Sequence, residues 1–458
     1  MSISQLQKNN HLLLRAGFGA NLSQIQDLSK LSEKEIWTQL SANYPLQKIE
    51  LKKDSVEVNY TSLAKMDAVS KKEILKKNRK QNLELNLRFL DQMVRSDDQL
   101  REKMAFFWHG HFATRVVKSQ FNEQLLHIIR EKALGNFGDL LLAVSQSPSM
   151  LQFLNNQQNK KGHPNENFAR EVMELFTLGR GNYTETDVKE GARAFTGWSF
   201  LPDGTFFERP KQHDFGPKTF LGKTGNFDGN DALKIILDQK ATAKFITTKI
   251  YKFFVNEKPD AQIIADLSQK FYDSNYDIKK LLTNIFTSSW FFKEENIGTK
   301  IKSPIDLMAG MMRILPMEIQ KPENLIVYQK LLGQMLFYPP NVSGWPSGKS
   351  WIDSSTLMLR LQMPQIWSGL RPLELEPKAD DDVEMGMKTA LNSYKNFKNP
   401  NIVIDWNLVE DVFKNKNAGD YLLQKKSLNL ENTVSKYAGT SIKSTIINLM
   451  STPEFQLC

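Results

Sequence analysis

The strongest constraint on the fold is a long stretch, residues 67–107, that contains no glycine and no proline. Apolar residues recur in it at helical spacing, which predicts one long helix, or two helices with a break near residues 96–98. The periodic residues are Leu83, Leu87, Leu90, Met93, Leu100, Met104 and Phe107. Gly110 follows and predicts the helix end, because glycine readily adopts the left-handed conformation that closes a helix.

Helix breakers are scarce in the whole chain, which has 24 glycines and 18 prolines in 458 residues. This favours a mainly α fold, and we predict a single large helical domain over residues 1–373. Residues 199–230 form a Gly- and Pro-rich irregular excursion within it, long enough to carry a small β-hairpin. The acidic segment 374–384 is predicted to be a surface loop or linker. Residues 385–458 are predicted to be a C-terminal helical segment that packs on the main domain.

Two shorter helices are marked by their ends. One is predicted from about Asn165 to Leu178 and stops at Gly179. The next begins at Thr184, because Asp187 three residues later completes a variant of the capping box. This second helix is predicted to end near residues 196–197.

A fourteen-residue pattern occurs three times, at residues 137–150, 278–291 and 442–455. Each copy has apolar residues at its first, fifth and eighth positions, a Ser or Thr at the eleventh and an apolar residue at the fourteenth. The pattern predicts a short amphipathic helix closed by a turn, whose last apolar side chain returns to the core. The copies are too far apart for a solenoid, so we interpret them as a repeated packing unit.

The chain shows no basic start followed by an apolar run, so no export signal is predicted, and a cytoplasmic location is expected. Its longest aliphatic run, residues 140–144, is far shorter than the ~20 residues that span a membrane. Cys458 is the only cysteine, which excludes an intramolecular disulfide. The formal net charge is +9, and residues 48–80 are basic. We interpret that segment as a solvated helix face and expect no nucleic-acid partner, because aromatic residues do not alternate with the lysines. Contact with another polyanion stays open.

Carboxylates and amides are concentrated on the helix predicted at 165–178. Arg170 and Glu174 lie one turn apart on one face, and Asn167 and Glu171 form an adjacent stripe. Two carboxylates beside a guanidinium group can have unlike pKa values or orient a substrate, so Arg170, Glu171 and Glu174 are candidate catalytic residues. Asn165 and Asn167 are candidate binding residues. The alternative is an ordinary ladder of surface ion pairs.

Two of the six histidines, His109 and His111, flank Gly110. In an extended segment, residues two apart lie on the same side, and Gly110 at a helix end would allow such a segment. They could then hold a divalent metal ion with further carboxylate or imidazole ligands. The partners considered are Glu171, Glu174, His213 and Asp214. Alternatively, His109 is stabilised at a helix C-terminus and His111 binds a backbone carbonyl.

The excursion and the residues before it hold more candidates. His213 and Asp214 are candidate catalytic residues, although adjacency alone is weak evidence for an acid–base pair. Arg193, Trp198 and Lys218 are candidate binding residues.

A second irregular segment, residues 339–351, carries the candidate binding residues Asn341, Trp345 and Trp351. Tryptophan rings there could stack on a sugar ring or fill the core. Gly348, Lys349 and Ser350 do not follow the spacing of a P-loop, so nucleotide binding is excluded for this segment.

These motifs together resemble the bacterial family catalogued as domain of unknown function 1800 (DUF1800). The resemblance runs in order along nearly the whole chain. It rests on residues 11–19, 107–112, 165–179, 183–188, 193–198, 213–218 and 339–351. The family has no assigned activity. The resemblance implies a partner similar to the alkaline-phosphatase and sulfatase superfamily and a periplasmic or envelope location. The chain departs from the family pattern in lacking an export signal and in having Phe176 where many relatives have histidine.

Two functional hypotheses follow, and the sequence leaves open whether the chain is an enzyme. The first is a hydrolase that acts on a glycan or another envelope-related substrate. It would use Glu171 and Glu174 as acid–base groups, and His109, His111 and His213 for metal binding or proton transfer. The alternative is a non-catalytic binding or assembly module for the phosphatase-like partner. Convergence of these five residues around one pocket would favour the first hypothesis.

Overall fold

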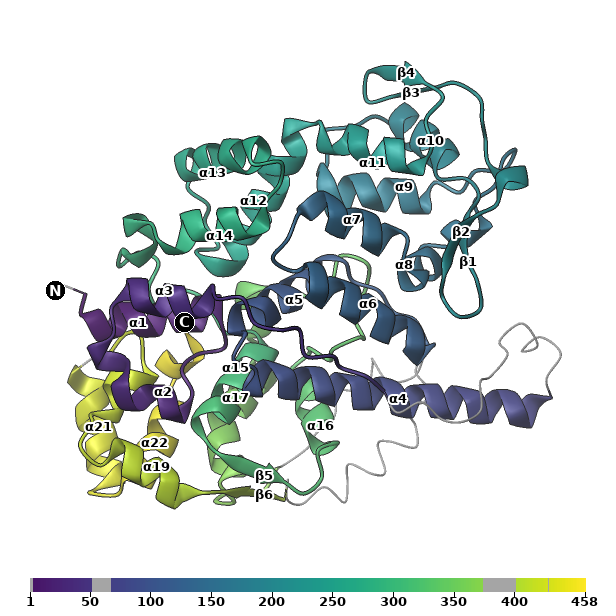
Figure 1. Ribbon diagram of the computed structural model, residues 1–458. Helices are drawn as coiled ribbons and strands as arrows, with labels where there is room; N and C mark the ends of the chain where they lie inside the picture. Colours follow the sequence, from purple (N-terminus) through teal and green to yellow (C-terminus); the bar gives the residue numbers. More distant parts are fainter. Residues whose placement is uncertain (1–2, 52–66, 374–400, 427) are drawn as a thin grey trace.

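The computed structural model describes residues 3–51, 67–373, 401–426 and 428–458 (Figure 1). Within these residues the fold is mainly helical and includes three two-stranded antiparallel sheets, as the mainly α prediction requires. The predicted acidic linker 374–384 and part of the basic segment 48–80 lie outside the described residues. Among the described residues, no helix combines the length and apolar character that a membrane crossing requires.

The N-terminal half contains the longest of the described helices. Its helices are α1 (Gln5–Ala16), α2 (Leu22–Asp27), η1 (Leu28–Lys30), α3 (Glu33–Leu40), α4 (Ala68–Arg95), α5 (Gln99–His111), α6 (Ser119–Lys132), α7 (Phe137–Ser145), α8 (Pro148–Phe153), η3 (Asn156–Gln158), α9 (Asn167–Glu171), η4 (Val172–Thr177) and α10 (Glu185–Ala194). The excursion follows, with β1 (Trp198–Phe200), β2 (Phe206–Glu208), η5 (Pro210–Gln212), β3 (Lys218–Phe220) and β4 (Lys223–Gly225).

The C-terminal half is helical again. Its elements are α11 (Gly229–Leu237), α12 (Lys240–Phe254), α13 (Ala261–Asp273), α14 (Ile278–Phe286), η6 (Ser289–Phe292), α15 (Pro304–Ile314), β5 (Met317–Ile319), α16 (Asn324–Leu331), η7 (Gly348–Trp351), α17 (Ser354–Trp367), β6 (Ile402–Ile404), α19 (Trp406–Phe413), α20 (Ala418–Leu422), α21 (Leu428–Ala438), α22 (Ile442–Met450) and η8 (Glu454–Gln456).

The predicted break in the first long helical stretch is confirmed. Helix α4 ends at Arg95, and α5 starts after Asp98, whose carboxylate accepts from the backbone N–H of Arg101 at 3.2 Å. The predicted stop at Gly110 is wrong, because α5 continues to His111. The helix closes one residue later, where Phe112 N–H donates to the carbonyl of Trp108 at 2.8 Å.

The excursion contains two hairpins, which confirms the predicted β-structure within 199–230. Strand β1 pairs with β2, and β3 pairs with β4. The capping box at Thr184 is also confirmed, since its hydroxyl accepts from Asp187 N–H at 3.2 Å and α10 begins there. Helix α10 ends at Ala194, two residues before the predicted end.

The repeated pattern is the same structural unit in all three copies. Each copy starts with a nine-residue helix, α7, α14 or α22. The hydroxyl at the eleventh position donates to a carbonyl of that helix: Ser147 to Val144, Ser288 to Asn284 and Thr452 to Leu449. The fourteenth side chain is buried in each copy: Met150, Phe291 and Phe455. The starts of the first two copies also lie side by side, because Asn136 and Asp277, the residues just before them, form an antiparallel bridge.

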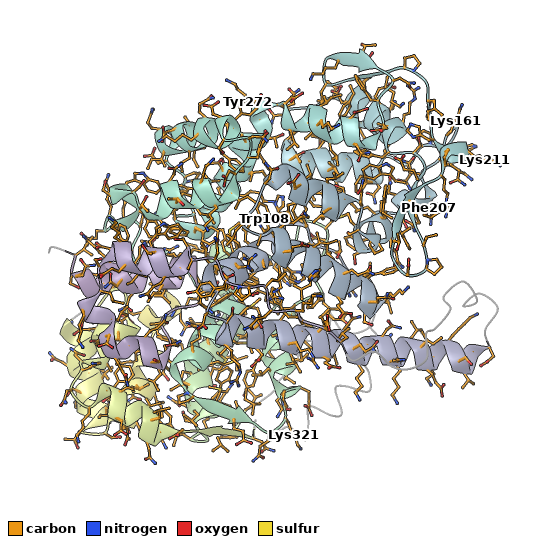
Figure 2. All side chains as sticks on the ribbon, viewed as in Figure 1. Trp108, Lys161, Phe207, Lys211, Tyr272 and Lys321 are labelled. Carbon is orange, nitrogen blue, oxygen red and sulfur yellow. The ribbon has the colours of Figure 1, made fainter. Side chains whose placement is uncertain are left out.

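Helices α5 and α6 run through the centre of the molecule (Figure 1). Helices α7–α14 and the two hairpins lie on one side of them, and α4, α15–α17 and the C-terminal helices lie on the other. The indole of Trp108 on α5 is fully buried at this centre, where its N–H donates to the carbonyl of Ala133 at 3.1 Å (Figure 2). Helices α19, α20 and α22 contact α2, α1 and α17, and β6 pairs with β5.

Candidate functional site

A cavity of about 390 Å³ lies where α5, α12, the start of α15 and residues 339–351 meet. We call residues 339–351 the tryptophan loop and this cavity the tryptophan-loop pocket. Its walls combine aromatic rings with lysine side chains. Among its lining residues are His111, Lys249, Lys252, Lys300, Trp345 and Trp351.

Two glycines allow the tryptophan loop to lie against the helices. Gly344 has φ +84°, and a Cβ there would collide with the carbonyl oxygen of Gly110 on α5. Gly348 has φ +59°, and a Cβ there would collide with the carboxylate of Glu257 just after α12. Only glycine combines this backbone conformation with such close approach. The loop therefore forms one wall of the pocket in a fixed position.

The candidate residues of the tryptophan loop separate into two kinds. Trp351 is buried and Trp345 is half-buried, and both line the pocket. Asn341 is exposed and lies outside the lining. Its side-chain oxygen accepts from Ser343 N–H at 2.9 Å, which stabilises the turn of the loop.

Among the described residues, no ion pair joins Lys249, Lys252 or Lys300 to a carboxylate, although the charges of Cys458 and Asp306 partly oppose the lowering of the pKa of Lys300. Lys249 donates to the carbonyl of Leu175 at 3.3 Å, and Lys300 donates to the carbonyl of Lys252 at 3.1 Å. Burial lowers the pKa of Lys249 and of Lys300 to about 8. Asp306 also lines the pocket, but its carboxylate accepts from the buried ammonium group of Lys103 at 2.5 Å.

His111 lies in the pocket wall beside an unusual helical turn. Helix α9 continues into the π-helix η4, and the carbonyl of Phe176 in η4 lies 3.1 Å from His111 Nε2. Burial and, to a lesser degree, the nearby Lys249 lower the pKa of His111 well below its usual value, while the Phe176 carbonyl opposes the shift. His111 is therefore a neutral imidazole bound to a backbone carbonyl, which is one of the two alternatives from the sequence.

His109 is buried away from the pocket lining. Its Nε2 accepts from Phe337 N–H at 3.1 Å, and its ring packs against Phe89, Phe337 and Trp345. Burial lowers its pKa to about 3. The expectation that His109 and His111 share one side is wrong, because the helix continues through Gly110 and residues two apart on a helix point in different directions. Among the described residues, no three His, Cys, Asp or Glu side chains are grouped to hold a metal ion.

The carboxylates of α9 and η4 are engaged on the surface. Arg170 donates to Glu185 on α10 through two contacts of 2.8 Å and to Glu166 at 3.1 Å. Glu174 accepts from Arg180 at 2.5 Å and from the Tyr183 hydroxyl at 2.7 Å. These bonds lower the pKa of Glu174, so it is an ionised structural partner.

Glu171 differs from its neighbours. It is half-buried, and burial followed by the charge of Glu174 raises its pKa. Raised carboxyl pKa values occur in general acids, but Glu171 does not line the tryptophan-loop pocket. The two candidate amides act locally: the Asn165 side chain accepts from Asn167 N–H at 3.0 Å, and the Asn167 side chain donates to the carbonyl of Leu154 at 3.3 Å.

The candidates in and before the excursion tie it to α10. Arg193 donates to Asp214 at 2.8 Å, which lowers the pKa of Asp214 to about 2. Lys218 donates to the carbonyl oxygens of Asp214 and Gly216 at 2.6 and 3.0 Å. The His213 Nδ1 lies 2.9 Å from the carbonyl of Thr196. These contacts stabilise the turn, and none of these side chains lines the tryptophan-loop pocket.

Trp198 is a core residue of the hairpin. Its ring is fully buried, and its N–H donates to Glu208 on the paired strand at 2.5 Å. The indole packs edge-on against Phe195 and Phe206.

The structure thus places one of the five convergence candidates, His111, in the pocket lining. His109, Glu171, Glu174 and His213 lie elsewhere. Lys249, Lys252 and Lys300 were not predicted from the sequence. Lys249 and Lys252 are three residues apart in α12, so their shared face was a signal in the sequence, although the helix also carries Lys240 and Lys244. No such signal marked Lys300 in the sequence, because only the tertiary fold brings Lys300 close to Lys249 and Lys252.

The model of the family described as Protein of unknown function (DUF1800) matches residues 11–457. No curated protein and no solved structure matches the chain. The match covers the helices on both sides of α5, the excursion and the tryptophan loop. The chain therefore belongs to the DUF1800 family.

Proposed function

We propose that the chain binds an anionic, ring-bearing ligand, such as an acidic glycan, in the tryptophan-loop pocket. The observation that carries this proposal is that Lys249 and Lys300 line one cavity and donate only to carbonyl groups among the described residues. Taking a charged group out of water is unfavourable unless an opposite charge compensates it. A bound anion would supply that charge, and the Trp345 and Trp351 rings offer faces on which a sugar ring can stack.

Hydrolysis of such an envelope-related glycan is the reaction class that we propose if the chain is an enzyme. The reaction would take place at the tryptophan-loop pocket, because the lysine and tryptophan side chains proposed to bind the ligand line that pocket. Glu174 is less suited as an acid or base, since Arg180 and Tyr183 already bind it. A divalent metal is not needed for the binding proposal.

Titration with a uronic-acid disaccharide and its carboxyl-reduced, neutral counterpart tests this proposal. Tryptophan fluorescence reports occupancy. We expect the acidic sugar to bind more tightly than the neutral one and to lose affinity as salt is raised. Lys249→Gln should weaken binding by about 10- to 150-fold, because hydrogen bonds to charged groups contribute ~1.5–3 kcal/mol.

Lys244→Gln is the matched control, because Lys244 is exposed on the same helix and lies outside the pocket. It should leave affinity unchanged. Equal binding of the acidic and neutral sugars, or equal effects of the two lysine substitutions, would contradict the proposal.

A second candidate function, non-catalytic assembly with a phosphatase- or sulfatase-like protein, has its own observation. A cavity of about 520 Å³ lies between α4 and the β1–β2 hairpin. Leu75, Val117 and Leu201 line it and are 44%, 52% and 43% exposed. Exposed apolar patches of this kind favour contact with another protein. Co-purification of a phosphatase-like protein with the wild type, and its loss with Leu201→Ser, would support this function; a partner that Leu201→Ser still retains would contradict it.

A further inference from the structure

We infer that Lys300 is a nucleophilic amine, which forms an imine with a carbonyl group of the anionic ligand in the tryptophan-loop pocket. This inference rests on the proposed function and deepens it. The ligand class narrows from ring-bearing anions in general to anions that also carry an aldehyde or a ketone, such as the reducing end of an acidic sugar. Under this assignment Lys249 and Lys252 bind the anionic group, and Lys300 bonds to the carbonyl carbon.

The first observation is the position of the Lys300 amine. Lys300 lines the pocket, and its side chain is half-buried. Its Nζ donates to the carbonyl of Lys252 at 3.1 Å, in a hydrogen bond that is exposed to solvent. The same Nζ lies 5.0 Å from the centroid of the Phe253 ring. Lys252 and Phe253 also line the pocket, so both contacts hold the amine at the pocket wall, where a ligand can reach it.

The second observation is the charge around this amine. The ammonium group of Lys103 lies 5.7 Å from the same Phe253 centroid, so two lysines share one aromatic ring. The carboxylate of Asp306 accepts from Lys103 at 2.5 Å. Asp306 is therefore bound by one of the two lysines, and that lysine is not Lys300. The Lys300 amine lies beside a second cation without an ion pair of its own among the described residues.

These surroundings favour the reactive, neutral form of the amine. Burial lowers the pKa of Lys300 to about 8, and the charge of Arg15 adds to the shift. Lys103 acts in the same direction, while Cys458 and Asp306 partly oppose it. An amine attacks a carbonyl group only after losing its proton, and desolvation or a neighbouring cation is how proteins favour that form of lysine. At pH 7 roughly a tenth of the Lys300 side chains would be neutral.

The proposed step balances without a further reactant. The Nζ lone pair of Lys300 forms a bond to the carbonyl carbon of the ligand. The carbonyl oxygen then leaves as water, with two of the three protons that the ammonium group carried. The product is a protonated imine, and nothing is oxidised or reduced. Because the imine keeps the positive charge, its attraction to the anionic group of the ligand is retained.

Trapping with pyridoxal phosphate, an aromatic aldehyde with an anionic group, tests the inference on the full chain. Borohydride reduces the imine to a stable amine, and peptide mass spectrometry then identifies the modified lysine in the wild type. At pH 7 we expect Lys300 to be modified at least about tenfold faster than Lys244, because lowering the pKa of a lysine increases its neutral fraction. Pyridoxine phosphate, which has an alcohol in place of the aldehyde, should leave no adduct.

Two controls connect the modification to the pocket. The uronic-acid disaccharide should slow the modification of Lys300 and leave that of Lys244 unchanged. Lys300→Arg should abolish the fast modification, since a guanidinium group keeps the charge but forms no imine, and Lys244→Arg should retain it. The peptide map and the protection by the disaccharide use the wild type, so they decide the question if Lys300→Arg does not fold.

Two results would overturn the inference while the proposed anion site stands. One is binding of the disaccharide to a chain in which Lys300 is modified no faster than Lys244. The other is fast modification of Lys249 in place of Lys300. Fast modification of Lys300 in a chain that does not bind the disaccharide would contradict the proposed function and support the nucleophilic amine.

Discussion

Lys249 shows how a single side chain links stability to the pocket. Its pKa is about 8 in the folded chain against 10.5 for an ordinary lysine. Between these values the unfolded chain binds more protons, so the free energy of unfolding rises with pH. Below about pH 8 the ammonium group is charged in both states, and the full cost of its burial remains.

We expect Lys249→Met to raise the free energy of unfolding at pH 7 by on the order of 1–3 kcal/mol, because it removes a half-buried charge. The gain should shrink between pH 8 and pH 10.5, where the wild-type lysine loses its proton on folding. Chemical denaturation at pH 7 and at pH 10 measures both effects.

Lys244→Met controls for a general effect of lysine removal, since Lys244 is exposed on the same helix. It should change stability by less than about 0.5 kcal/mol at either pH. The expectation is contradicted if Lys249→Met is less stable than the wild type at pH 7. The Lys249 ammonium group would then make a contact that stabilises the fold by more than its burial costs.

Helices α5 and α6 are joined by a buried ion pair. Arg130 donates to both carboxylate oxygens of Glu102 at 2.9 and 2.6 Å, and both side chains are 1% exposed. Glu102→Gln should lower the free energy of unfolding by about 3–5 kcal/mol, because it leaves a buried guanidinium group without its charge partner. Urea denaturation provides the measurement.

The exposed pair of Asp91 and Arg95 on α4 is the matched control. Asp91→Asn should cost less than about 1 kcal/mol, since water screens exposed ion pairs. The double variant Glu102→Leu, Arg130→Met should recover much of the loss, because two apolar side chains can replace a buried pair. Equal costs at the buried and exposed pairs would refute this account.

The tryptophan loop supplies a prediction at the level of a whole segment. Gly344→Ala should lower the free energy of unfolding by about 1–3 kcal/mol and weaken ligand binding, because φ +84° is strained for alanine and the new Cβ would meet the Gly110 carbonyl. Gly333→Ala separates the two causes, since Gly333 has φ +83° but no atom within 4 Å of a Cβ. Loss of binding in both variants would contradict the role of the close contact.

Local signals in the sequence predicted the ends of several elements. The break at residues 96–98, the capping box at Thr184 and the hydroxyl-closed helices of the repeated unit depend on neighbours a few residues away. The predicted stop at Gly110 failed because glycine only permits a helix end. The packing of α5 decides that the helix continues to His111.

The candidate site was less predictable for the same physical reason. Lys249, Lys300 and Trp345 are distant in the sequence, and only the fold brings them to one cavity. The adjacent polar residues His213 and Asp214 were predicted to be catalytic. In the structure Asp214 accepts from Arg193, and His213 lies within hydrogen-bond distance of the Thr196 carbonyl. Clusters of polar residues in the sequence therefore predicted where hydrogen-bond networks form. They did not predict where the fold leaves a cavity.

For the whole molecule, the buried apolar residues form one connected core that extends from Leu12 to Phe455. Phe455→Ala should therefore lower the stability of the entire chain by about 3–5 kcal/mol, not only that of its own segment. Hydrogen exchange of α10, which lies on the opposite side of the molecule from the C-terminal helices, is the measurement (Figure 1). Met358→Ala, at a side chain that is 56% exposed, is the control. Unchanged exchange in α10 would indicate two independently unfolding parts.

The walls of the tryptophan-loop pocket come from four separate stretches of the chain, residues 106–111, 249–257, 300–306 and 334–351. An unfolded chain cannot assemble them, so a ligand of this pocket binds the native state alone and raises the melting temperature, because it stabilises that state by RT ln(1 + [L]/Kd) at free ligand concentration [L]. The shift in melting temperature then reports which compounds bind the pocket. A library of small acids screened by thermal shift could reveal what this protein recognises before any reaction is known.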